Sequence, residues 1–160
     1  MFAKNYAGRS APSNVVGSVQ VEELKLVDDM KNVAVLYSKS KNIMLETGST
    51  RAYKEDFHRL VGKDGNYIIY YVPGVIKAFE IFAYSENSKS NLDISVSADG
   101  KDFSSVKVTE DNLDIGKLDY EYVPPVLIQG ELTSDESTSY LKIEFKDDVQ
   151  IGRVEISYKN

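Results

Sequence analysis

The residues of this chain that could do acid–base or nucleophilic chemistry are few. The single histidine, His58, stands in the run Asp56-Phe57-His58-Arg59, where an imidazole could orient a proton or bind a ligand hydroxyl. No second metal ligand or nucleophile motif accompanies it in the sequence, and the GxSxG, HExxH and glycine-rich phosphate-binding motifs do not occur. A surface histidine explains this pattern more simply than a catalytic one does.

Carboxylates are too numerous to single out a catalytic pair. Asp and Glu together number 25, so one carboxylate will always lie near another, and a glycosidase-like couple cannot be picked from the sequence. The chain has no cysteine, which excludes disulfides, thiolate metal sites and a cysteine nucleophile. We therefore expect a domain that is not itself an enzyme.

Length and charge exclude further classes of protein. A chain of 160 residues is long enough to form one domain with its own core. The net charge is −6, and acidic and basic residues are mixed along the chain without a basic cluster. This argues against a surface that binds nucleic acid or an anionic membrane. No apolar stretch approaches the ~20 residues that span a bilayer. The start, MFAKNYAGRSAPSN, also lacks the apolar core of a signal peptide.

The elements that would position a site are β-strands. Residues 67–72 and 75–84 are almost continuous apolar runs separated by Pro73-Gly74, which predicts two central strands. Residues 92–98 alternate between apolar and polar side chains, so one face of that strand is expected to meet water. Asp99-Gly100 predicts a tight hairpin. A turn-forming role explains the aspartate at position 99 better than a catalytic role does.

The remaining pattern completes an antiparallel β-sandwich or jelly roll of eight or nine strands. Further strands are predicted at 15–27 with a bulge, 33–37, 118–132 with an edge or bend at Pro124-Pro125, 141–145 and 154–158. Polar loops are predicted at 38–63, 109–117 and 133–139. The first is long enough to contain ligand-binding residues, and it is predicted to include a short helical turn that follows Thr50. Residues 1–13 are predicted to be a linker or frayed terminus, followed by a single domain at 14–160.

The order of these segments resembles a known family. The segments are VDDMKNVAVLYSKSKN, DFHRL, NYIIYYVPGVIKAFEIFAYS, LDISVSADGKDFSSV and YLKIEFKDDVQIGRVEISY. Together they resemble the galactose-binding-like sandwich of discoidin-type domains, and most of all the carbohydrate-binding modules appended to secreted bacterial glycoside hydrolases and polysaccharide lyases. The resemblance covers Asp28 to Tyr158. Relatives often carry tryptophan where this chain has Ala83 to Asn87, so Tyr84 would replace it.

A sugar site needs a flat apolar face for a pyranose ring and polar groups for its hydroxyls. Tyrosine supplies the first, while Asp, Asn, Glu and Arg supply the second, with Arg59 as a bidentate anchor. Such domains bind through loops on a rigid sandwich. The expected ligand-binding residues flank the central strands: Tyr53, Asp56, His58, Arg59, Tyr84, Glu86, Asn87 and Tyr122. For each of them, ordinary loop or edge surface is the alternative interpretation.

The resemblance also implies one structural Ca²⁺ between an early loop and the last strand. A hard cation takes carboxylate and carbonyl oxygens, and the expected ligands are Asp28, Asp29 and Glu155, with Asp56 as a further oxygen donor. Glu155 stands where the resemblance places a ligand glutamate. A solvated glutamate paired with Lys or Arg is the alternative.

The leading hypothesis is a non-catalytic carbohydrate-binding module that targets a polysaccharide for an attached enzyme. We expect it to be monomeric, extracellular and bacterial, with any leader peptide outside this sequence, and to bind an oligosaccharide or polysaccharide but no nucleic acid or membrane. The alternative is a structural, protein-interaction or adhesion sandwich without a sugar site, which the absence of tryptophan favours. A small β-sandwich hydrolase or lyase is a third possibility.

Overall fold

The computed structural model describes residues 22–53, 56–85, 89–113, 122–133 and 137–160, together with the backbone of 4–5 and 8–9. Apart from the short 3₁₀ helix η1 (Thr50–Tyr53), every regular element in this part is a strand, so the predicted all-β class is confirmed. Strand β1 (Lys4–Asn5) pairs with β2 (Gly8–Arg9) inside the segment predicted as a linker. The division of the chain at residue 13 stays a prediction.

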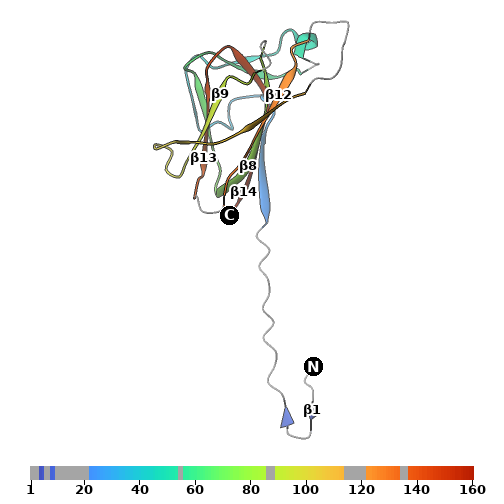
Figure 1. Ribbon diagram of the computed structural model, residues 1–160, viewed down its shortest axis with the longest axis vertical. Helices are drawn as coiled ribbons and strands as arrows, with labels where there is room; N and C mark the ends of the chain where they lie inside the picture. The colour runs from blue at the N-terminus through green and yellow to red at the C-terminus, as the bar shows by residue number, and fades with distance from the viewer. Residues whose placement is uncertain are drawn as a thin grey trace.

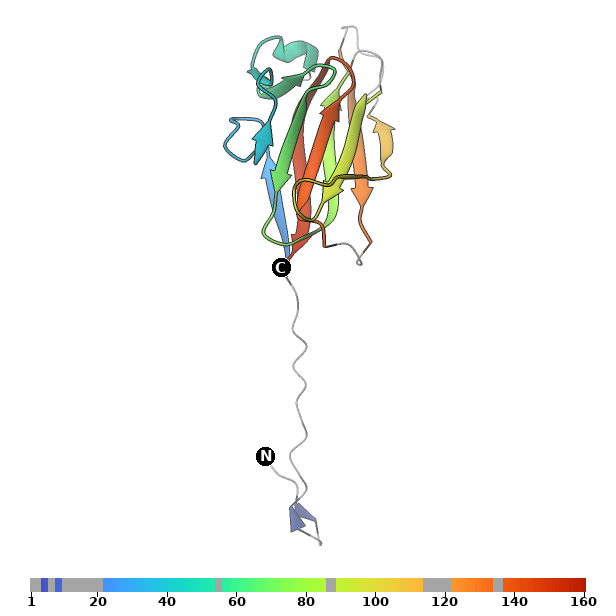
Figure 2. The same cartoon turned by 90° about the vertical axis from the view of Figure 1, so that its left-hand side faces the viewer.

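Two antiparallel sheets form the sandwich, one on each side in Figure 1. The sheet that faces the viewer in Figure 2 has five strands in the order β10 (Ser104–Ser105), β9 (Leu92–Ser97), β13 (Tyr140–Phe145), β7 (Tyr67–Tyr71) and β4 (Ser38–Lys39). The opposite sheet has the order β11 (Thr109–Asn112), β12 (Pro125–Glu131), β8 (Val75–Tyr84), β14 (Val149–Lys159), β6 (Arg59–Gly62) and β5 (Met44–Glu46). Strand β3 (Glu23–Asp28) also pairs with β14 in this sheet.

The core lies between the two sheets, where the alternating side chains of both inner faces meet. In β9, Leu92, Ile94 and Val96 are buried while Asp93 is exposed, as the alternation predicts. In β13, Leu141, Ile143 and Phe145 point inward in the same way. Burial of these apolar surfaces is the main force that holds the two sheets together.

Strand β14 is the axis of the larger sheet. It pairs with β8 along its length on one side. On the other side it pairs first with β6, over Val149 to Ile151, and then with β3, over Val154 to Lys159. The register against β8 shifts between Ile151 and Arg153, so Gly152 stands at a bulge. The predicted pinning of the last strand into a sheet is confirmed.

Of two predictions about the long polar segment 38–63, one is confirmed and the other is wrong in part. The helical turn behind Thr50 is confirmed as η1. The rest of the segment is more regular than predicted, because β4, β5 and β6 form within it. Strands β4 and β5 have no buried residue, so backbone pairing rather than a hydrophobic pattern defines them. Strand β6 places Leu60 in the core.

Two further predictions were wrong, and of the two alternatives for the strand at 118–132, an edge position or a bend, the edge position was wrong. Residues 33–37 form a turn instead of a strand, closed by the Leu36 amide donating to the Val33 carbonyl at 3.2 Å. The predicted loop 109–117 contains strand β11, and β12 is therefore an interior strand that begins at Pro125 rather than an edge strand. Proline is tolerated there because the first residue of a strand can do without a ladder donor.

The turn at Asp99-Gly100 is confirmed, but the hairpin is not tight. The first pair that closes it is Ser104 with Val96, so the loop is longer than two residues. Gly100 has a positive φ of 74°, and the Asp99 carboxylate accepts bonds from the amides of Lys101 and Asp102 at 2.8 and 3.0 Å. These bonds hold the pKa of Asp99 down at about 2. Asp99 therefore has the turn-forming role that the sequence predicts.

Candidate functional site

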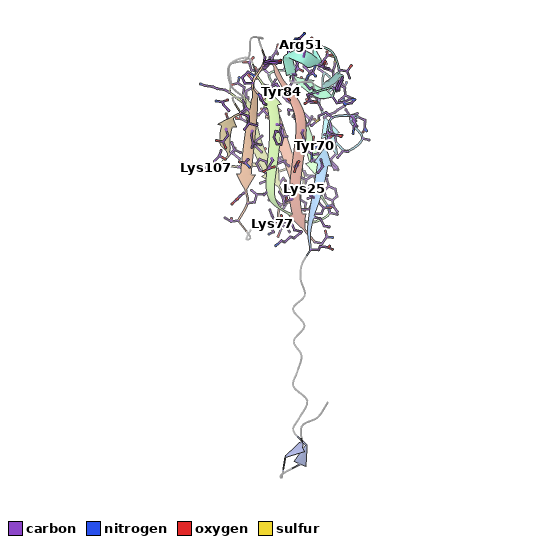
Figure 3. The ribbon with its side chains drawn as sticks, turned by 90° about the vertical axis from the view of Figure 1, so that its right-hand side faces the viewer. Lys25, Arg51, Tyr70, Lys77, Tyr84 and Lys107 are labelled. Carbon is purple, nitrogen blue, oxygen red and sulfur yellow. The ribbon has the colours of Figure 1, made fainter. Side chains whose placement is uncertain are left out.

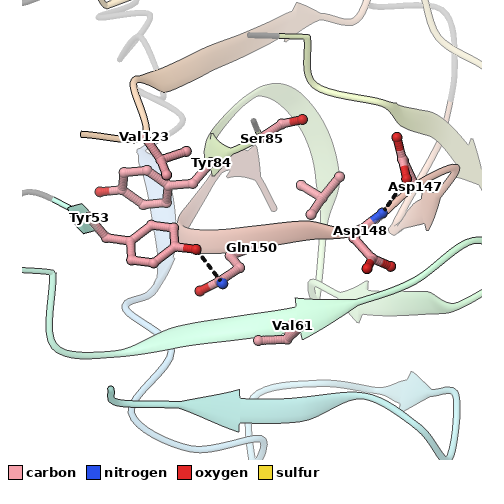
Figure 4. Close-up of a pocket in the computed structure, with 9 residues that line it drawn as sticks. Tyr53, Val61, Tyr84, Ser85, Val123, Asp147, Asp148 and Gln150 are labelled. Atoms are coloured by element: carbon pink, nitrogen blue, oxygen red, sulfur yellow. Dashed lines mark hydrogen bonds between the residues drawn. The ribbon is translucent and has the colours of Figure 1, made fainter. Parts of the chain in front are cut away.

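A pocket of about 450 Å³ opens where η1, the end of β8 and the turn between β13 and β14 meet. Figure 3 places Tyr84 and Arg51 at this end of the sandwich, opposite Lys77. The register sets Gln150 of β14 beside Tyr84 of β8 and Val61 of β6. The residues that line the pocket, most of them labelled in Figure 4, are Tyr53, Val61, Tyr84, Ser85, Val123, Asp147, Asp148, Val149 and Gln150.

Two tyrosines form one wall of this pocket. The rings of Tyr53 and Tyr84 meet edge to face, with centroids 5.3 Å apart and an interplanar angle of 87°. The Tyr53 hydroxyl accepts a hydrogen bond from Gln150 Nε2 at 2.8 Å. The Tyr84 hydroxyl donates to Asp56 Oδ2 at 3.3 Å. Burial, followed by the Asp56 charge, raises the pKa of Tyr84 to about 12, so this phenol stays protonated as a donor.

Arg59 lies behind the tyrosine wall and fixes it. Its guanidinium stacks on the Tyr53 ring at 4.2 Å, and its Nε donates to Gln150 Oε1 at 2.7 Å. The two terminal nitrogens donate to the carbonyl oxygens of Asp56 and Gly48. Arg59 is 0% exposed, so it has no surface to offer a ligand. The expectation that Arg59 anchors a sugar directly is therefore corrected: it ties the loop around η1 to strand β14.

Asp56 and His58 lie in an adjacent hollow of about 400 Å³, which is lined by Asp29, Asp56, Phe57, His58, Gly152 and Arg153. Asp56 connects the two pockets because its carboxylate accepts the Tyr84 hydroxyl bond. A Cβ at Gly152 would collide with the Asp56 carboxylate and come within 3.0 Å of Tyr84 Cε2. Glycine at the β14 bulge therefore makes room for the contact between Asp56 and Tyr84.

The remaining expected ligand-binding residues are placed differently. Tyr122 is half-buried and precedes Val123, whose amide donates to the Ala52 carbonyl at 2.9 Å, but it is not among the pocket-lining residues. Glu86 and Asn87 lie outside the described residues. The structure thus brings Tyr53, Asp56 and Tyr84 together.

Sequence reasoning missed four residues of this region: Gln150, Gly152, Asp147 and Asp148. Neither the two aspartates nor Gln150 was among the expected ligand-binding residues, and Gln150 lies in a stretch without a distinctive motif. Their proximity to Tyr84 follows from the pairing of β8 with β14, which joins positions far apart in the chain. Only a prediction that β8 pairs with β14 could have placed these residues next to Tyr84.

The three expected calcium ligands do not converge. Asp28 pairs with Val154 and points into the sandwich, where its carboxylate accepts bonds from the Tyr70 hydroxyl and the Met30 amide, both at 3.0 Å. Glu155 is the next residue along β14 and thus faces outward, where it binds Lys25 and Arg153, both at 2.6 Å. Asp29 pairs with Lys31. Among the described residues, no group of three or more His, Cys, Asp or Glu could hold a metal ion.

Comparison with known proteins finds a likeness to a solved structure. No protein-family model and no curated protein matches the chain. A solved structure of a family 6 carbohydrate-binding module is similar over 84% of this chain and 94% of its own, with 10% sequence identity and a TM-score of 0.44. In the described part of the chain, no helix has the length and apolar character needed to cross a membrane.

Proposed function

We propose that this chain is a non-catalytic carbohydrate-binding module that holds an attached secreted enzyme close to its polysaccharide. The observation that carries the proposal is the wall of Tyr53 and Tyr84, fixed in an open pocket. Tyrosine faces suit the CH side of a pyranose ring, while Gln150 and the pocket carboxylates suit its hydroxyls. The module itself needs no catalytic group for this role.

The network behind the wall supports the proposal because it reduces the entropic cost of binding. Arg59 and Gln150 hold the Tyr53 ring and hydroxyl in one position, and Asp56 does the same for Tyr84. A ligand therefore does not have to order these side chains, each of which would otherwise cost affinity. Attachment to an enzyme would then convert a weak single site into a high local concentration of substrate.

Replacing the exposed part of the wall tests the proposal. Tyr53→Ala removes the ring that separates Arg59 from the pocket, and we expect it to weaken glycan binding by about tenfold or more. Affinity electrophoresis against plant cell-wall and host polysaccharides, followed by calorimetry on the best ligand, measures the effect. Tyr71→Ala is the matched control, since Tyr71 is exposed on the five-stranded sheet and does not line the pocket. Equal binding by wild type and Tyr53→Ala would contradict the site.

One observation favours the alternative function, a protein-interaction or adhesion domain. Tyr37 and Tyr71 are 60% and 44% exposed, and both contact Tyr140 on the outer face of the five-stranded sheet. Met44 and Leu45 are also exposed on β5, at the end of the larger sheet. Exposed apolar groups of this kind are typical of contact surfaces. If no polysaccharide retains the protein, this alternative replaces the leading proposal.

A further inference from the structure

The described lining of the pocket carries negative charge. Of the described residues that line it, Asp147 and Asp148 are the charged ones, and both are exposed. Figure 4 shows them across the pocket from Tyr53 and Tyr84. The Asp147 carboxylate accepts a bond from the Asp148 amide at 2.8 Å and meets Asn91 Nδ2 at 3.5 Å, so the turn geometry fixes its position.

Three described cations, Lys63, Lys146 and Arg59, lie near the pocket without lining it. Lys63 lies 4.0 Å from Asp148, but both side chains are more than 70% exposed, so solvent screens the pair. Lys146 pairs with Glu144 and Asp93. Arg59 is buried behind Tyr53 and its donors are occupied. Among the described residues that line the pocket, the charge is therefore that of the two aspartates.

This charge distribution suits hydroxyl and ammonium donors and disfavours acidic sugars. A sugar hydroxyl can donate to an aspartate in a charge-assisted hydrogen bond, and a protonated amino group adds an attractive charge. A uronic acid carboxylate or a sulfate ester would be repelled by both aspartates, and the net charge of −6 on the whole chain adds to the repulsion.

We infer that the pocket bounded by Tyr53, Tyr84, Asp147 and Asp148 takes neutral or amino sugars and rejects acidic ones. This inference rests on the proposed function, since it concerns the ligand class of the same site. It concerns the charge of the sugar that the pocket accepts.

The test compares polysaccharides of different charge in affinity gels at low ionic strength. The probes are soluble β-glucan and galactomannan as neutral polymers, chitosan as the amino polymer, and polygalacturonate and chondroitin sulfate as acidic polymers. We expect at least about tenfold stronger retention by a neutral or amino polymer than by either acidic one. Added salt should narrow the difference, because screening weakens the repulsion.

A charge-neutralised variant ties the selectivity to the pocket. Asp147→Asn with Asp148→Asn removes both charges and keeps an oxygen acceptor for the turn. We expect it to raise the affinity for acidic polymers relative to neutral ones by several-fold. The control, Asp102→Asn with Asp111→Asn, removes the same charge from exposed positions that do not line the pocket, and should leave the ratio unchanged.

The possible failures are distinguishable. Retention on an acidic polymer that equals or exceeds retention on the neutral and amino polymers would overturn the inference while the proposed function stands. The inference would also be overturned, with the proposed function intact, if the pocket variant changed the ratio of acidic to neutral polymer affinity no more than the control variant does. Absence of retention on every polymer would overturn the proposed function itself. The comparison of polymers and salt on the wild-type protein decides the question even if the variant does not fold.

Discussion

At the scale of single residues, two buried tyrosines each donate a hydroxyl to a carboxylate. Tyr84 donates to Asp56 at 3.3 Å, and Tyr70 donates to Asp28 at 3.0 Å. Burial is the largest cause of the raised pKa of both phenols, and the facing carboxylate adds to it. Both bonds exist only while the phenol is protonated, because a phenolate cannot donate to a carboxylate.

The raised pKa values predict alkaline instability. A tyrosine whose pKa is higher in the folded than in the unfolded state contributes stability that is fully present below the unfolded value near 10. For Tyr84 this contribution is lost as the pH rises through about 12. We therefore expect the free energy of unfolding, measured with denaturant, to fall above about pH 10. Tyr84→Phe should make this fall shallower, whereas Tyr71→Phe, at an exposed position, should not. A pH-independent free energy across this range would contradict the burial of both phenols.

A calcium ion remains a prediction that melting curves can check. Asp28 and Glu155 face opposite sides of the larger sheet and are occupied by Tyr70, Lys25 and Arg153. An ion that binds the folded state and not the unfolded one raises the melting temperature, and the rise grows with the logarithm of the ion concentration once this exceeds the dissociation constant. If calcium is bound, the melting temperature should be higher with millimolar calcium than with EDTA, and magnesium at the same concentration serves as the control. Identical melting curves would reject a tightly bound structural ion.

At the scale of elements, the bulge in β14 links the sheet to the pocket. The strand changes partner from β6 to β3 near Gly152, and the residues on either side contribute to different sites. Gln150 enters the tyrosine pocket, while Arg153 lines the adjacent hollow. A bulge re-aims side chains in this way because the extra residue breaks the regular alternation.

The bulge predicts a position where a single methyl group harms binding. In Gly152→Ala the added Cβ would displace the Asp56 carboxylate and press on the Tyr84 ring. We expect a loss of about 1 to 3 kcal/mol of stability from the overpacking, together with weaker glycan binding. Denaturant unfolding measures the first and calorimetry the second. Ser157→Ala, in the same strand but away from the pocket, is the control. Unchanged binding in Gly152→Ala would show that the Asp56 contact does not position the wall.

The elements with a clear hydrophobic period could be predicted from the sequence. Residues 92–98 and 141–145 alternate strictly, and they form β9 and β13. Strand β11 could not be found in this way, because its four residues, TEDN, are all exposed and only its backbone pairing with β12 makes it a strand. Residues 33–37 looked like a strand because of their apolar content, but Leu36 packs on the core from a turn.

The candidate site was predicted in part for a similar reason. Tyr53 and Tyr84 could be proposed because their residue type and loop position suit a sugar. The burial of Arg59 could not be foreseen, since a charged residue is rarely fully buried unless its donors find partners. Those partners, Gln150 and the carbonyls of Gly48 and Asp56, come from three separate segments that only the folded sheet brings together.

At the scale of the whole molecule, the described contacts of the sandwich begin at β3. The buried core begins at Met30, and the earliest apolar residue that packs against it is Leu26 of β3. At the other end, β14 runs to Lys159 and lies inside the larger sheet. The described contacts that stabilise the domain therefore come from residue 23 onward, apart from the local pair β1 and β2.

Removing residues 1–13 should thus leave the domain intact. Because the described residues that form or pack against the core begin at Leu26, we expect the melting temperature of the 14–160 chain to stay within about 1 °C of the full chain, below the shift of roughly 2–4 °C that about 1 kcal/mol of lost stability produces in a domain of this size. Glycan affinity should also be unchanged, since the pocket lies at the end formed by η1 and the turn before β14. A matched deletion of 23–28 removes β3 and should lower the melting temperature strongly, because it exposes the edge of β14 and takes away the Leu26 side chain that packs against the core. A large loss of stability in the 14–160 chain would instead show that the first residues pack against the sandwich and that the predicted boundary at residue 13 is wrong.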